Sequence, residues 1–150
     1  MPILTIPTQF GPLTLWEDDS AIVRLDWDGN GTDDTPLLVE AARQVQAYAA
    51  GTLTEFDLPL RIKGSDFQRD VCAQMSAIPF GETVTYGDIA KALNQSAQAV
   101  GSACGGNPNP VIIPCHRVMG AKGLTGFSGK GGVETKVALL RHEGAGGFLI

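Results

Sequence analysis

The sequence predicts an α+β protein in two domains, with a small antiparallel sheet and one helix in residues 1–62 and a mostly helical domain in residues 63–150. Short runs of β-branched and aromatic residues are concentrated in the first part, whereas helix-capping patterns recur in the second. The charge changes at the same boundary. Residues 1–62 carry three basic and ten acidic side chains, a net charge of −7, and residues 63–150 carry eight basic and six acidic, a net charge of +2. We place the hinge at Lys63-Gly64.

Four short runs of the first domain are expected to be strands, and one longer segment a helix. The strand runs are residues 3–6, 13–16, 21–27 and 56–62. The last run contains Pro59, which is tolerated at the edge of a sheet. Thr35 followed by Pro36 is typical of a helix start, and apolar residues continue at helical spacing up to Gly51. The pattern predicts a meander with one packed helix, and nothing in this domain suggests chemistry.

The segment Asp26-x-Asp28-x-Asn30-Gly31 matches the opening of a calcium-binding EF-hand loop. Such a loop needs a bidentate glutamate at its twelfth position, but Leu37 stands there and no helix leads into the segment. The same residue types are common in turns. We therefore interpret the segment as a turn and expect no metal site.

The second domain begins with a helix. Ser65-x-x-Gln68 is a capping-box pattern, and the apolar stripe that follows ends at Pro79. Cys72 and Met75 lie on or beside this stripe, so we expect both in the core.

Two further short helices predict a helix-turn-helix. Thr85-x-x-Asp88 is a second capping pattern, and Asn94-Gln95-Ser96 forms the turn before a helix from Ala97 to about Cys104. This last helix is unusually rich in small residues. They permit close approach either to another helix or to a narrow groove, and the sequence alone does not decide between these.

The final helix is expected from Gly132 to His142. Glu134 near its start and Arg141 near its end suit the helix dipole, and Gly144 fits its C-terminal cap. Its buried face is expected to consist of Val133, Val137, Leu139 and Leu140.

The cysteine and histidine content bounds the chemistry and the compartment. Cys72, Cys104 and Cys115 are an odd number with no pairing pattern, which favours reduced thiols in the cytoplasm. With only His116 and His142 and no C-x-x-C, a zinc site is not expected. No run approaches the roughly twenty apolar residues of a membrane span, and no secretory signal is recognised.

The most informative stretch places a thiol, an imidazole and a guanidinium in succession after a proline. Pro114 fixes its own φ and restricts the residue before it, so Cys115 has a defined position. A thiol needs a base or a positive field to become a nucleophile, and His116 or Arg117 could supply either. The alternative is an inert, buried cysteine. Neighbours on an extended chain point to opposite faces, so His116 need not touch the sulfur.

Several separated motifs in the second part of the sequence closely resemble the O6-alkylguanine-DNA alkyltransferases, also called methylated-DNA–protein-cysteine methyltransferases. The resemblance extends from about Gly64 to Gly144 and is loose before that. It is carried by Asn107-Pro108, Pro110, Ile113-Pro114-Cys115-His116-Arg117-Val118, Gly126-Phe127-Ser128-Gly129 and Leu139-Leu140-x-His142-Glu143-Gly144.

The resemblance implies direct repair in a single turnover. Cys115 would accept the alkyl group from guanine O6, His116 would act as base through a water, and Glu143 would orient the imidazole. Asn107 would hold the active-site turn, and Tyr86 would give a proton to the leaving base. The alkylated sulfur is a stable thioether, so each molecule would react once.

Further residues are implied in substrate recognition. Ser128 would contact O6, Pro110 and Phe127 would line the alkyl pocket, and the backbone carbonyls of Cys115 and Val118 would read the guanine amino group. The target base would be flipped out of the duplex.

The implied partner is double-stranded DNA containing O6-alkylguanine, bound by a monomer without a cofactor or an obligate protein partner. The helix-turn-helix would enter the minor groove. The residues expected to contact DNA are Ala97, Gln98, Ser102 and Arg117. Gln98 stands where the family usually has an arginine that fills the space of the flipped base, so we expect weaker binding or slower flipping. The net charge of +2 also predicts a shallow salt dependence.

Three other interpretations stay open. The chain could bind alkylguanine lesions without transfer, although such relatives lack the reactive cysteine. It could be a thiol hydrolase, but no sequence feature marks an oxyanion hole. It could also lack catalysis altogether, with all three cysteines in the core.

Overall fold

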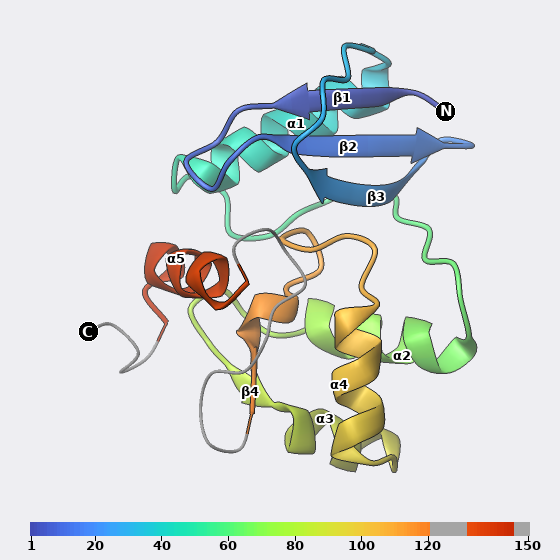
Figure 1. Cartoon of the computed structure of the whole chain (residues 1–150), viewed down its shortest axis with the longest axis vertical. Helices are drawn as coiled ribbons and strands as arrows, with labels where there is room; N and C mark the ends of the chain where they lie inside the picture. The colour runs from blue at the N-terminus through green and yellow to red at the C-terminus, as the bar shows by residue number, and fades with distance from the viewer. Residues whose placement is uncertain (121–131, 146–150) are drawn as a thin grey trace. The chain divides into compact units, whose positions relative to one another are not determined.

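The computed structural model describes residues 1–120 and 132–145, and the chain folds into two compact units (Figure 1). Unit 1 is Met1–Lys63 and unit 2 is Gly64–Ile150. A three-stranded antiparallel sheet with one helix makes up the first, and helices dominate the second. The predicted α+β class is therefore confirmed. Among the described residues, every helix is too short or too polar to span a bilayer.

The sheet of unit 1 follows the order of the sequence. Its strands are β1 (Ile3–Ile6), β2 (Leu13–Asp18) and β3 (Ala21–Trp27). The central strand β2 places Leu15 opposite Leu4 on one side and Leu25 on the other. One face of this sheet is covered by α1 (Pro36–Ala49), whose inner side buries Leu38 and Tyr48 (Figure 1). The helix begins where predicted, because the Thr35 hydroxyl accepts a hydrogen bond from the backbone N–H of Leu38 at 3.1 Å.

The expected edge strand at residues 56–62 is reduced to one bridge, so that prediction was wrong in extent. Leu60 pairs with Ile22 as an isolated parallel bridge. Two hydrogen bonds support it, from Ile22 N–H to Pro59 O at 2.8 Å and from Arg61 N–H to Ile22 O at 3.1 Å. Because Pro59 has no N–H to donate, the ladder cannot continue through it.

The segment that resembled a calcium loop is bound to the sheet as a turn. The backbone oxygen of Gly31 accepts from the Thr5 N–H at 3.0 Å, and the Gly31 N–H donates to the Thr5 hydroxyl at 2.8 Å. The Asp28 N–H donates to Pro12 O at 2.9 Å. Within residues 1–120 and 132–145, no group of three or more His, Cys, Asp or Glu side chains is arranged to hold a metal ion.

Unit 2 begins with α2 (Asp66–Ser76), which buries Cys72 and Met75 as predicted. The Ser65 hydroxyl accepts from the backbone N–H of Gln68 at 3.1 Å, which is one half of the predicted capping box. The Gln68 side chain instead donates to the backbone oxygen of Ala103 at 2.8 Å. This hydrogen bond connects the start of α2 to the later helix that contains Ala103.

A helix-turn-helix follows, as predicted (Figure 1). It consists of α3 (Tyr86–Leu93) and α4 (Ala97–Gly105). The capping box at the start of α3 is complete, with Asp88 N–H to the Thr85 hydroxyl at 3.0 Å and Thr85 N–H to the Asp88 carboxylate at 2.9 Å. The turn is made by Asn94 in the left-handed conformation, and the Ser96 hydroxyl caps α4 by accepting from Ala99 N–H at 3.1 Å.

The last helix, α5 (Val133–Glu143), buries Leu139 and Leu140 as predicted, but the rest of its buried face differs from the prediction. Val133 is 41% exposed, so its expected place in the core was wrong. The buried residues Lys136, Leu139, Leu140 and Glu143 follow the spacing i, i+3, i+4, i+7. The apolar pattern misled us because two charged side chains occupy this inner face.

Candidate active site

Asn107 connects the end of α4 to the segment that carries the cysteine. Its side-chain N–H donates to Ile113 O at 2.8 Å, and its side-chain oxygen accepts from Asn109 N–H at 3.0 Å. Its backbone N–H donates to Cys104 O at 3.2 Å. The loop before Cys115 is thus closed on itself by one buried amide.

The same loop contains a strained residue. Val111 is 1% exposed and has φ +74°, a conformation that a β-branched residue rarely adopts. Pro110 precedes it and is buried, and Ile113 N–H donates to Asn109 O at 2.8 Å to close the turn. Such strain persists only where the surrounding structure enforces the geometry. The turn is therefore built rigidly directly upstream of the thiol.

Cys115 begins a single 3-10 turn, Cys115–Arg117, after Pro114. The side chain is almost buried, with the whole residue 5% exposed. Burial raises the pKa of the Cys115 thiol to about 11, while hydrogen bonding by Asn107 and the positive charge of Lys136 oppose the rise. In the protein without DNA, Cys115 is therefore a thiol at neutral pH, and it needs a base when it reacts.

His116 is held by a carboxylate from the far end of α5. Its Nε2 lies 2.6 Å from the Glu143 carboxylate, and both side chains are fully buried. Burial lowers the pKa of His116, while the hydrogen bond to Glu143 raises it. The other ring nitrogen, Nδ1, is buried and has no hydrogen-bond partner among the described residues. A neutral imidazole that donates from Nε2 to Glu143 has an unprotonated Nδ1, which can accept a proton.

Arg117 completes the same cluster and is 6% exposed. Its Nε and Nη2 donate to the two oxygens of Glu143 at 2.7 and 3.0 Å, and its Nη1 donates to Ile78 O at 2.7 Å. The guanidinium also lies 5.7 Å from the centre of the Phe80 ring. This placement does not support the expectation that Arg117 contacts DNA. It neutralises Glu143 instead.

Lys136 belongs to the same region, and sequence reasoning missed it. It is fully buried, and its Nζ donates to Val118 O at 2.6 Å and lies 6.0 Å from the centre of the Tyr86 ring. Burial lowers its pKa, while the thiols of Cys115 and Cys104 act in the opposite direction. The available signal was its spacing from Leu139, Leu140 and Glu143, but a lysine on a buried face is too rare to be expected.

The structure places two further expected site residues, Tyr86 and Val118, next to this cluster. Tyr86 is half-buried at the start of α3, directly after the short strand β4 (Val84–Thr85). β4 pairs in parallel with β5 (Val118–Met119), which follows the 3-10 turn. The buried Val118 carbonyl, expected to read guanine, already accepts one hydrogen bond from Lys136. Phe127 and Ser128 lie outside the described residues.

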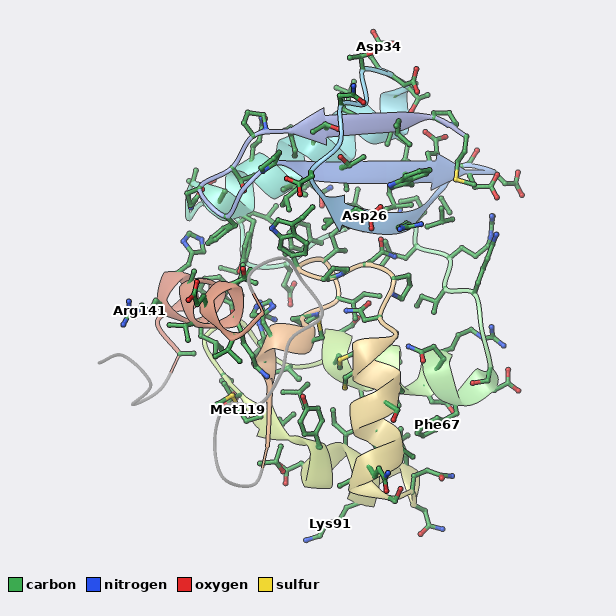
Figure 2. The ribbon with its side chains drawn as sticks, viewed as in Figure 1. Asp26, Asp34, Phe67, Lys91, Met119 and Arg141 are labelled. Carbon is green, nitrogen blue, oxygen red and sulfur yellow. The ribbon has the colours of Figure 1, made fainter. Side chains whose placement is uncertain are left out.

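The outer face of α4 consists mostly of small residues. Ala97, Gln98 and Ser102 are exposed, and a Cβ at Gly101 would meet no described atom within 4 Å apart from its chain neighbours and the backbone of its own helix. The inner face buries Val100 and other apolar residues against the rest of the unit. On α3, Lys91 projects away from the protein (Figure 2). Because these side chains are small, a ligand can approach the backbone of α4 closely on this face.

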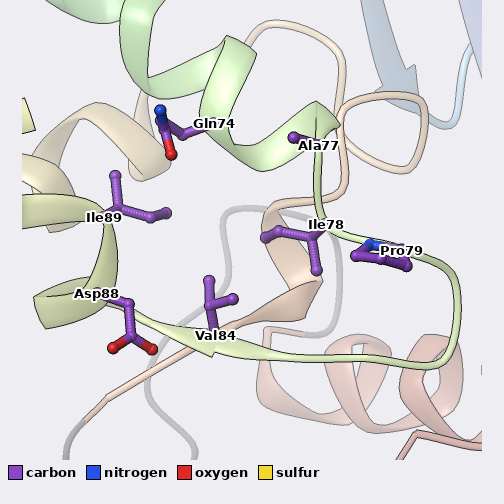
Figure 3. A pocket seen from close by; sticks show the side chains of 7 residues that line it. All are labelled: Gln74, Ala77, Ile78, Pro79, Val84, Asp88 and Ile89. Carbon is purple, nitrogen blue, oxygen red and sulfur yellow. The ribbon is translucent and has the colours of Figure 1, made fainter. Parts of the chain in front are cut away.

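A pocket of about 200 Å³ lies elsewhere in unit 2 (Figure 3). It is lined by Gln74, Ala77, Ile78, Pro79, Val84, Asp88 and Ile89. None of these side chains was expected in the site, and the thiol of Cys115 does not line it.

Together these features define a class of protein: a helix-turn-helix unit that carries a buried thiol next to a histidine–glutamate pair, suited to covalent chemistry on nucleic acid. Comparison with known families agrees. Residues 66–145 match the family described as "6-O-methylguanine DNA methyltransferase, DNA binding domain", and residues 4–62 match its "ribonuclease-like domain". The chain belongs to the 6-O-methylguanine DNA methyltransferase family.

Individual relatives show the same likeness over most of the chain. A methylated-DNA–protein-cysteine methyltransferase of Mycobacterium tuberculosis is 43% identical over 150 residues, covering 93% of this chain and 90% of the relative. One of Archaeoglobus fulgidus is 49% identical over 109 residues, covering 70% and 74%. The crystal structure of Mycobacterium tuberculosis OGT in complex with DNA has a TM-score of 0.85 at 41% identity and covers 95% of this chain and 93% of that one.

Proposed function

We propose that this protein repairs DNA by transferring an alkyl group from O6-alkylguanine to Cys115, irreversibly and once per molecule. The observation that carries the proposal is the buried set of Cys115, His116 and Glu143, in which the carboxylate fixes one imidazole nitrogen and the other has no partner within residues 1–120 and 132–145. Membership of the family and the DNA complex of its relative support it.

The step is a displacement at carbon. The Cys115 sulfur forms a bond to the alkyl carbon while the bond from that carbon to guanine O6 breaks, and the electron pair passes into the purine. The thiol proton leaves through a water to His116 Nδ1, and the resulting imidazolium is stabilised by Glu143. Tyr86 supplies a proton to the leaving base. The product thioether has no bond that water readily cleaves, which explains the single turnover.

Arg117 and Asn107 are proposed to position the reacting groups. Arg117 holds both oxygens of Glu143 and thereby fixes the imidazole of His116. Asn107 fixes the turn and hydrogen bonds the sulfur as it gains charge. Ser128, Phe127 and Pro110 remain the proposed contacts to O6 and the alkyl group, and the second lone pair of the Val118 carbonyl remains available to the guanine amino group.

DNA is proposed to dock on the exposed face of α4 through Ala97, Gln98 and Ser102, with the alkylated guanine flipped toward Cys115. Arg117 and Lys136 are buried and do not contribute to this surface. Setting aside these two cations and the buried Glu143 lowers the formal charge of residues 63–150 from +2 to +1. We expect binding to depend on shape and base flipping more than on charge.

We also propose residues 1–62 and 63–150 as the two domains, with all of the chemistry in the second. The separation into compact units and the separate family matches support this division. We further propose a cytoplasmic monomer; the free thiols of Cys72, Cys104 and Cys115 support a reducing compartment.

The decisive experiment is a transfer assay with O6-methylguanine DNA, followed by mass spectrometry. The peptide containing Cys115 should gain about 14 Da, the mass of one methylene, in an amount equal to the protein added. Cys115→Ala should abolish the gain, whereas Cys72→Ala is the matched control and should retain it. Tight binding of the lesion without the gain would instead identify a lesion-binding protein, and repeated turnover of an ester would identify a hydrolase.

A further inference from the structure

Lys136 is an unusual residue because it is a fully buried cation that forms no ion pair with any carboxylate in the described part of the chain. Among the described residues, the acidic group in the same core is Glu143, which is engaged by two donors of Arg117 and by His116. The Lys136 Nζ donates to the neutral carbonyl of Val118 and faces the Tyr86 ring. A buried charge with such partners is costly unless a counter-charge forms beside it.

The anchor of Lys136 places it at the turn that carries the acceptor thiol. Val118 N–H donates to Cys115 O across the 3-10 turn, and Val118 O accepts from Lys136 Nζ at 2.6 Å. Two hydrogen bonds therefore connect the Cys115 backbone to the ammonium group. Of the groups that act on Lys136, the Cys115 thiol is the strongest that can become negative, followed by that of Cys104.

His116 is not placed to be the positive partner of a resting thiolate. Its burial and the nearby positive charges of Arg117 and Lys136 favour the neutral imidazole, whereas Glu143 favours the charged form. The imidazole becomes positive only after it has taken the proton. A separate cation is needed to stabilise the sulfur as that proton leaves.

We propose that Lys136 is this cation: a positioning residue that remains protonated and stabilises the Cys115 thiolate through space. The proposal deepens the proposed function, because it takes Cys115 as the acceptor. Burial disfavours both the ammonium and the thiolate when each is alone, and the pair offsets much of that cost because their charges cancel. The same cation reaches Tyr86 and so links the acceptor sulfur to the proposed proton donor.

The first test measures the ionisation of Cys115 without DNA, so it does not depend on alkyl transfer. The rate at which iodoacetamide labels the Cys115 peptide is followed against pH in wild type, Lys136→Gln, Lys136→Met and Lys136→Arg. Cys104→Ala is the background for all four, because that thiol also acts on Lys136. We expect the apparent pKa of Cys115 to rise by about one unit in the glutamine and methionine variants, a tenfold loss of thiolate, and to return toward wild type in the arginine variant.

A purely structural role gives a different result. If the role of Lys136 is only structural, the Lys136→Gln variant should have the same pH profile as wild type, because glutamine keeps a donor for the Val118 carbonyl and lacks only the charge. Identical profiles in all four proteins would overturn the proposal. Lys91→Met removes an exposed lysine from the same unit and is the matched control for a general loss of charge.

The second test works in a variant that leaves Lys136 in place and therefore remains informative if the lysine variants do not fold. Coupling is reciprocal, so the sulfur must also act on the lysine. In Cys115→Ala, the pKa of Lys136, followed by NMR of its side-chain carbon, should fall below the wild-type value. A Lys136 pKa that is the same in Cys115→Ala and wild type would overturn the proposal. If the Lys136 pKa falls in Cys115→Ala as expected but the wild type fails to accept a methyl group, only the proposed function is overturned.

Discussion

Replacing Arg117 with methionine should destabilise unit 2 strongly, because it leaves the Glu143 carboxylate buried without its neutralising partner. The change removes two hydrogen bonds to Glu143, at 2.7 and 3.0 Å, and one to Ile78 O at 2.7 Å. Removing one partner of a buried ion pair costs about 3–5 kcal/mol. Methionine keeps much of the apolar contact with Phe80, so this cost comes from charge rather than from a cavity.

The assay is urea unfolding of wild type and variant. With a slope of about 2 kcal/mol per molar urea, a loss of about 4 kcal/mol lowers the midpoint by about 2 M. Lys91→Met, which removes an exposed lysine, should move the midpoint by about 0.25 M or less, since a surface change costs at most about 0.5 kcal/mol. Adding Glu143→Gln to Arg117→Met should recover part of the loss, because no unpaired charge then remains.

The opposite pattern would refute this reasoning. If Arg117→Met unfolds within about 1 kcal/mol of wild type but binds undamaged DNA more weakly, the guanidinium acts at the DNA surface, as the sequence suggested. A double variant no more stable than Arg117→Met would also show that Glu143 does not depend on this arginine.

Three further predictions concern the exposed face of α4, the buried thiols and the N-terminal cap of α3. Gln98→Arg should raise affinity for undamaged and alkylated DNA, measured by fluorescence anisotropy, and an unchanged affinity would show that residue 98 does not meet DNA. Folding raises the pKa of Cys115 to about 11 and of Cys104 to about 12. The stability that these thiols contribute is therefore complete below pH 8. It should fall as the pH rises toward 11, because the thiols of the unfolded chain ionise at a lower pH than those of the folded protein. Urea unfolding at pH 8 and pH 10.5 measures this loss of stability, and Cys104→Ala should reduce it. An equal loss in that variant would show that Cys104 does not contribute to the pH dependence. Thr85→Ala removes the cap shared with Asp88 and should cost about 1 kcal/mol, and a neutral result in thermal unfolding would show that the capping box is not needed.

Local signals in the sequence predicted most of the fold. Thr35, Ser65, Thr85 and Ser96 each accept the backbone hydrogen bond that their position before a helix predicts. These interactions span three residues, so a single sequence contains all of the information. The edge strand failed at Pro59 because pairing also depends on a distant strand.

The candidate site was only partly predictable for the same reason. Cys115 and His116 are adjacent in the chain, so their chemistry could be inferred directly. The ion pair of Arg117 was not predicted because its partner Glu143 is 26 residues away. Lys136 was missed because its partner, the Val118 carbonyl, is a backbone atom that no side-chain pattern marks.

The open space beside Gly101 makes this helix a convenient attachment point for a reporter. The Cβ of a cysteine introduced there would meet no described atom within 4 Å outside its own helix, and a Cys115→Ala background leaves Cys72 and Cys104 as buried thiols. Such a label would sit near the middle of α4, on the face proposed to meet the duplex. Arrival of DNA could then be timed in a protein that cannot take up the alkyl group.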